Sequence, residues 1–84
     1  MLKTLYSVFD SKSQTYAAPF SEINDGTAIR AIQDLMEQNP NHPFARHSED
    51  FHLERVGRFN ELSGDLDTEP VGEVIKLREL VKEQ

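Results

Sequence analysis

One amphipathic segment, residues 24–38, constrains the fold more than any other part of the chain. Apolar side chains recur in it at helical spacing: Ala28, Ile29, Ala31, Ile32, Leu35 and Met36. Asp25 and Thr27 can each accept a hydrogen bond from the free amides of a first helical turn, whereas Pro40 and Pro43 cannot continue a helix. The pattern predicts a helix that ends before the prolines and buries one face against a second layer.

Strand patterns on both sides of this helix supply the second layer. Residues 1–9 and 15–21 predict a hairpin with a polar turn, and Pro19 marks an edge or an exit of its second strand. Residues 51–59 predict a third strand, in which Gly57 indicates a bulge or a close backbone approach. Its alternation places Phe51, Leu53, Arg55, Gly57 and Phe59 on one face. Before this strand, we expect Phe44 to anchor the loop to the core and Ser48–Asp50 to form a short turn.

The C-terminal part predicts a short strand and a second helix. Asp65 to Asp67 suit a strand, and Thr68 is a suitable helix cap. An amphipathic helix over about residues 69–83 would carry the stripe Val71, Val74, Ile75, Leu77, Leu80 and Val81. This helix either closes the core or serves as a dimer seam or docking surface. The order ββαββα predicts an α+β fold with a small antiparallel sheet and two amphipathic helices.

A series of short motifs resembles one known family. The motifs are Pro19-Phe20, NDGTAIRAI from Asn24, Asp34, PFARHSEDF from Pro43, Leu53, Val56-Gly57, Phe59 and Ser63-Gly64. Their order and spacing, over roughly Leu2 to Asp65, are similar to the small nonstructural protein of gokushoviruses, which are microviruses with circular single-stranded DNA. Ile32, Ser48 and Phe51 are mild departures from that pattern. The resemblance implies an accessory protein that acts in genome replication or in the switch to packaging.

Length and composition describe a single small domain over residues 1–84. With 37% hydrophobic and 29% charged residues, the chain is typical of globular rather than disordered proteins. There is no apolar run near the ~20 residues of a membrane span, no signal peptide and no cysteine, so we expect a protein of the host cell cytoplasm without membrane contact. A core this small is marginal, and we expect a partner or a second copy, as a homodimer, to complete it.

Neither a metal site nor an enzyme is indicated. His42, His47 and His52 lie near Glu49 and Asp50, but their spacing across a proline-rich loop sets no ligand geometry. The two carboxylates would need a cleft and a perturbed environment to act as a catalytic pair. The sequence has no glycine-rich phosphate loop, no Ser/His/Asp arrangement and no zinc-hydrolase motif. We therefore expect no catalytic residue, no metal and no cofactor.

The candidate functional surface is a basic and aromatic face. Single-stranded DNA is held by cations along its backbone and by aromatic side chains that stack on its bases, each stack contributing about 1–3 kcal/mol. The candidate nucleic-acid-binding residues are Arg46, Arg55, Arg58, Lys3, Lys12, Arg30, Tyr6 and Tyr16. The alternative is that the aromatic residues belong to the core and the arginines pair with Glu49, Asp50 and Glu54.

The charge distribution leaves two functions open. The net charge is −6, with three Lys/Arg against seven Asp/Glu over residues 60–84. An acidic chain is at a disadvantage with phosphates, which favours a protein-interaction factor that regulates the replication initiator or host machinery. The resemblance and the mixture of arginine and aromatic residues favour a DNA-binding accessory protein of a single-stranded DNA phage. If the protein binds DNA, we expect the acidic segment Glu61–Glu73 to compete with DNA for the basic face.

Overall fold

A computed structural model describes residues 2–69 and 71–81. Its elements are β1 (Leu2–Asp10), β2 (Thr15–Tyr16), β3 (Phe20–Glu22), α1 (Asp25–Gln38), α2 (Pro43–Arg46), η1 (Ser48–Asp50), β4 (Phe51–Asn60), β5 (Leu66–Asp67), β6 (Gly72–Lys76) and η2 (Leu77–Leu80). The predicted α+β class with a small antiparallel sheet is confirmed. Within this part of the chain, no helix has the length and apolarity needed to cross a membrane.

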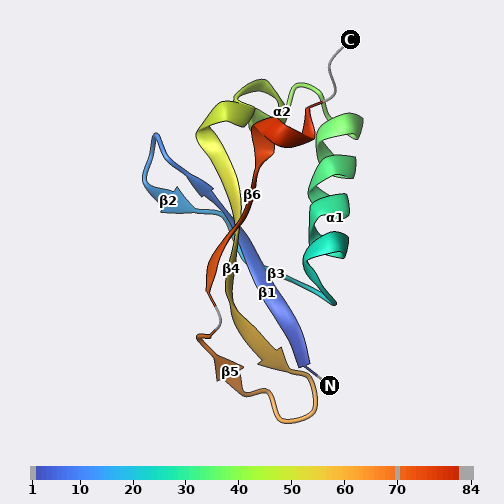
Figure 1. Cartoon of the computed structure of the whole chain (residues 1–84), viewed down its shortest axis with the longest axis vertical. Coiled ribbons are helices and arrows are strands. Elements are labelled where there is room, and N and C mark those ends of the chain that lie inside the picture. The colour runs from blue at the N-terminus through green and yellow to red at the C-terminus, as the bar shows by residue number, and fades with distance from the viewer. Residues whose placement is uncertain (1, 70, 82–84) are drawn as a thin grey trace.

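Two long strands form the centre of a six-stranded sheet (Figure 1). β1 and β4 run antiparallel over their whole length, with Leu2 opposite Asn60 and Asp10 opposite Phe51. β2 and β3 pair with the outer edge of β1, and β5 and β6 pair with the outer edge of β4. The predicted second strand is therefore two short strands. Pro19 lies in the gap between them, since proline has no amide hydrogen for the ladder.

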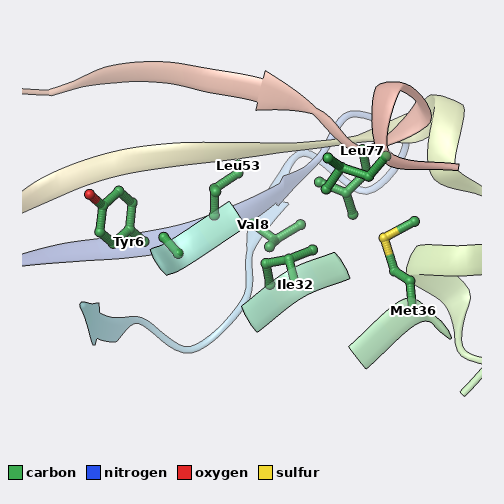
Figure 2. Close-up of a cluster of buried hydrophobic side chains, with 8 residues drawn as sticks. Tyr6, Val8, Ile32, Met36, Leu53 and Leu77 are labelled. Atoms are coloured by element: carbon green, nitrogen blue, oxygen red, sulfur yellow. The ribbon is translucent and has the colours of Figure 1, made fainter. Parts of the chain in front are cut away.

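α1 packs on one face of this sheet (Figure 1). Its buried residues Ala28, Ile32 and Met36 recur every four positions and so lie along one side of the helix. The buried hydrophobic side chains of the described chain are Tyr6, Val8, Ala28, Ile32, Met36, Leu53, Leu77 and Leu80. Figure 2 shows these side chains filling the space between α1 and the central strands.

The start of α1 differs in one detail from the prediction. Asn24, rather than Asp25 or Thr27, is the N-cap residue. Its side chain accepts a hydrogen bond from the Thr27 amide at 2.9 Å, and the Thr27 hydroxyl accepts one from the Asn24 amide at 3.3 Å. This reciprocal capping box satisfies two amides of the first turn. Asp25 is not used as a cap, and its carboxylate instead faces the sheet.

The loop after α1 packs onto the core as predicted. Phe44 in α2 contacts Phe51, with ring centroids 4.9 Å apart. His42 caps α2, because its Nδ1 atom accepts a hydrogen bond from the Phe44 amide at 3.1 Å. Ser48–Asp50 forms the expected short turn, η1. The proline-rich loop therefore places the Phe44 side chain against the end of the core.

The predicted C-terminal helix is wrong over the residues that the structure describes. Gly72–Lys76 forms strand β6 instead, and Leu77–Leu80 forms the short 3-10 helix η2. Residues 70, 82 and 83 of the predicted helix lie outside the described residues. One of the two roles expected of this segment is nevertheless present, since Leu77 and Leu80 are buried in the core.

The reason for this error is a nonlocal hydrogen-bonding partner. Val74 and Ile75 are β-branched, and such residues suit a strand at least as well as a helix. β4 would offer unpaired amides and carbonyls along its outer edge if the segment were helical. β6 pairs with that edge, placing Ile75 opposite Leu53. Sheet pairing therefore overrides the helical spacing of the apolar residues.

The predicted bulge in β4 is present and changes which face the later residues occupy. Val56 is the extra residue, between Arg55 and Gly57, when β4 is aligned with β1. A one-residue shift moves every following side chain to the other face. Phe59 therefore lies on the face opposite to Leu53, not on the same face as the sequence predicted.

We expect Gly57→Ala to destabilise the fold more than Gly64→Ala. A Cβ atom at position 57 would lie 2.4 Å from the Asp67 carbonyl oxygen, whereas a Cβ atom at position 64 would meet no atom within 4 Å. Both glycines have a positive φ. Gly64→Ala therefore measures the cost of an alanine at positive φ where the added Cβ atom meets no neighbouring atom. Urea unfolding should give losses of roughly 3 kcal/mol for Gly57→Ala and about 1 kcal/mol for Gly64→Ala. Equal losses would contradict a close approach of β5 to Gly57.

Candidate functional site

The structure divides the predicted nucleic-acid-binding residues among several elements. Lys3 and Tyr6 lie in β1, Tyr16 in β2, Arg55 and Arg58 in β4, Lys12 in the turn after β1, Arg30 in α1 and Arg46 in α2. The β1–β4 register places Lys3 and Arg55 on opposite faces of the sheet. The whole set therefore does not share one surface.

Tyr6 and Arg55 meet at the carboxylate of Asp25. The Tyr6 hydroxyl donates to Oδ1 at 2.6 Å, and Arg55 Nη1 donates to Oδ2 at 2.5 Å. Tyr6 is fully buried, so its ring is not available to stack on a base. These contacts join β1 and β4 to the first turn of α1, and they give Tyr6 and Arg55 a structural role.

The cations at the far end of the sheet are paired with the acidic segment. We call residues 2–5 and 57–67 the distal arm, because this part of the sheet extends beyond α1 (Figure 1). Lys3 Nζ lies 3.4 Å from a Glu61 carboxylate oxygen, and Arg58 Nη2 lies 3.6 Å from one of Asp67. Arg58 Nε also donates to the Glu69 carbonyl oxygen at 3.2 Å. These exposed pairs contribute little to stability, but each places a carboxylate where a phosphate would bind.

Three predicted cations have no ion pair within residues 2–69 and 71–81: Lys12, Arg30 and Arg46. They belong to a turn and to two helices, so none of them shares a strand face with Tyr16. Tyr16 is 54% exposed and is the one predicted aromatic contact that remains accessible. The structure therefore separates Tyr16 from these three predicted cations.

The sheet face opposite α1 gathers the side chains that alternate with the core. We call it the open face, and its members are Ser7, Phe9, Tyr16, His52, Glu54, Val56, Glu73 and Lys76. Tyr16, Phe9 and His52 form a row, with ring centroids 4.8 Å and 5.3 Å apart. In the described part of the chain, no helix covers this face (Figure 1).

An apolar hollow opens on the open face beside this row. Its volume is about 250 Å³, and its lining residues are Ser7, Tyr16, Ala17, Pro19 and Val56. The bulge at Val56 and the break between β2 and β3 supply its two sides. The Ser7 hydroxyl in the hollow donates to the Ala17 carbonyl oxygen at 2.6 Å, so it is already satisfied. The hollow thus presents apolar surface to whatever enters it.

Glu54 connects the hollow to the aromatic row. One carboxylate oxygen accepts a hydrogen bond from the Tyr16 hydroxyl at 3.1 Å, and the other lies 2.6 Å from His52 Nε2. Desolvation by neighbouring atoms, together with the Glu54 carboxylate, raises the pKa of Tyr16. Across the β4–β6 ladder, the partner of Glu54 is Glu73. The open face therefore combines an apolar hollow with two neighbouring carboxylates.

The three histidines do not converge on one point. His42 caps α2, and His52 contacts Glu54. His47 instead lies near Glu49 and Asp50, with one possible ligand atom from each within 4.8 Å of the others. His47 and Glu49 are exposed, and exposed groups of this kind are common without an ion. The expectation that the site carries no metal therefore stays a prediction.

Sequence reasoning identifies part of the open face and misses part of it. Alternation along residues 51–59 places His52, Glu54 and Val56 on one face, as the structure does. The prediction of a helix over residues 69–83 hides the position of Glu73 opposite Glu54. The signal available in the sequence was the alternation along β1, which separates Phe9 from the buried Tyr6 and Val8.

The Tyr6 hydroxyl gives the fold a measurable pH dependence. Burial, with the hydrogen bond to Asp25, raises the pKa of Tyr6 to about 12. The folded state therefore holds this proton more tightly than the unfolded chain does. The resulting stabilisation is complete below the ordinary pKa of 10.0 and is lost as the pH rises through about 12. We expect Tyr6→Phe to remove this part of the alkaline loss in urea unfolding, whereas Tyr16→Phe keeps it. An unchanged alkaline slope in Tyr6→Phe would contradict the assignment.

Comparison with known proteins supplies a context for this geometry. No curated protein and no solved structure matches the chain. Residues 3–80 match the sequence profile of a family described as Phage ORF5 protein. Because that match covers most of the chain, the protein belongs to the Phage ORF5 family of phage proteins.

Proposed function

We propose that this phage protein is an accessory factor that acts by binding another protein through its open face. The observation that carries the proposal is the apolar hollow on a sheet face that no described helix covers. Exposed apolar surface rimmed by polar side chains is one feature of interaction sites. The protein acts by binding rather than by catalysis, and it needs no cofactor.

The placement of charge supports a protein partner over nucleic acid. Two of the four arginines expected to bind DNA, Arg55 and Arg58, lie against carboxylates. The accessible aromatic row on the open face is flanked by Glu54 and Glu73, which would repel phosphates. The cations that stay unpaired in the described chain lie outside this face.

The biological setting of the proposal comes from the family and from the motifs. Membership of a phage protein family supports a role in the phage life cycle. The resemblance of the NDGTAIRAI and PFARHSEDF motifs to the gokushovirus nonstructural protein leads us to place that role in a microvirus. The partner would then be the replication initiator, an assembly protein or a host protein, met in the host cell cytoplasm.

A photo-crosslinking residue in place of Ala17 tests this proposal in infected cells. Ala17 is exposed and lines the hollow, so the substitution leaves the core intact. We expect irradiation to give an adduct that is sensitive to protease and resistant to nuclease. The matched control is the same residue in place of Ile23, which is 69% exposed in the turn before α1. Adducts of equal yield from both positions, or none from position 17, would contradict the proposal.

A DNA-binding accessory role is the second candidate, and the position of the acidic segment favours it. Glu61 and Asp67 lie against Lys3 and Arg58 on the distal arm, as expected of a segment that competes with phosphates. Deleting the residues after Gly64 would remove β6 and part of the core together with the acidic segment. A change in DNA binding of that truncated chain could therefore not be assigned to the acidic side chains. Neutral substitutions of the two acids leave the fold intact and free the two cations.

We expect Glu61→Gln with Asp67→Asn to bind single-stranded DNA as weakly as the natural chain. The DNA-binding candidate predicts instead micromolar or tighter binding, with a salt slope steeper by about 0.7 for each cation released. A labelled oligonucleotide titrated at several salt concentrations separates the two outcomes. Asp65→Asn with Glu69→Gln is the matched control, because it makes the same change in net charge outside these ion pairs.

A further inference from the structure

We propose that the open face binds a partner segment that presents a lysine or arginine next to a large apolar side chain. This inference rests on the proposed function and specifies the chemistry of the partner. Three observations carry it: the size and lining of the hollow, the two carboxylates beside it, and the net charge of −6.

The hollow is small for a small-molecule site and large enough to accept an apolar side chain. Its volume of about 250 Å³ lies below the roughly 300–1,000 Å³ of small-molecule sites. Its lining is apolar, and the Ser7 hydroxyl already donates to Ala17. An aliphatic or aromatic side chain would therefore enter without leaving a polar group unpaired. A polar side chain would lose its hydration there and gain no partner.

Two glutamates lie on neighbouring strands of the open face. Glu54 and Glu73 are directly opposite in the β4–β6 ladder, where like charges are destabilising. His52 Nε2 lies 2.6 Å from Glu54, and Lys76 Nζ lies 3.9 Å from Glu73. A partner cation next to Glu54 and Glu73 would add a further favourable charge interaction. The Tyr16 hydroxyl, which donates to Glu54, links this position to the hollow.

Other occupants fit this chemistry less well. Phosphate groups and acidic protein segments would both be repelled by Glu54 and Glu73. A second copy of the chain, docked face to face, would bring the two acidic pairs together. A basic segment is favoured locally by these carboxylates and at long range by the net charge of −6.

A displayed library of random peptides tests the inference on the full-length protein. We expect enriched peptides to combine lysine or arginine with a neighbouring Leu, Ile, Phe or Met. For one such peptide, titration should show at least tenfold weaker binding to Glu54→Gln with Glu73→Gln. Ala17→Leu, which places an apolar side chain in the hollow from an exposed position, should weaken binding to a similar extent. Ala18→Leu makes the same change at an exposed neighbour that does not line the hollow, so it is the matched control and should leave the affinity unchanged.

Several outcomes would overturn the inference. One such outcome is that the enriched peptides are acidic or lack a charge preference. Another is that the natural chain and the Ala17→Leu variant bind equally. A third is self-association through the hollow, measured by sedimentation. Failure to enrich any peptide would also overturn it. The crosslinking experiment at position 17 is independent of peptide chemistry, so the proposed function can survive that failure. Circular dichroism checks that each variant is folded before its affinity is compared.

Discussion

The attachment of α1 to one face of the sheet is the constraint on which the rest of the structure depends. The apolar side of this helix supplies three of the eight buried core residues of the described chain. Its first turn is fixed to the sheet by Asp25, which accepts hydrogen bonds from Tyr6 and Arg55. Once one face is committed to α1, the alternation of β1 and β4 places the remaining side chains on the other face. The open face is thus a direct consequence of how α1 packs.

The same packing explains why the cations predicted to bind DNA do not share one surface. Arg55 forms an ion pair with Asp25. It therefore joins β4 to α1 instead of extending freely into solvent. Lys3 and Arg58 are held by acids that the chain brings back along the distal arm. Of the two tyrosines expected at a site, Tyr6 serves the core and Tyr16 lies on the open face.

An antiparallel sheet with one solvated face is common, so openness alone does not indicate function. What distinguishes this face is an apolar hollow beside two opposed carboxylates, Glu54 and Glu73. Exposed apolar surface and paired like charges both reduce the stability of the free protein. Local costs of this kind are expected where a protein keeps a surface for a partner.

Periodic apolar residues in the sequence were enough to predict α1 and the central strands. Single residues were enough to predict the anchor Phe44 and an irregularity at Gly57. The sequence by itself did not determine the C-terminal strand, because Val74 and Ile75 fit either conformation and the free edge of β4 decides between them. It also did not determine which charges meet: Asp25 and Arg55 are 30 residues apart. Local patterns encode which side of an element is buried, whereas pairing across the sheet and through space depends on the assembled fold.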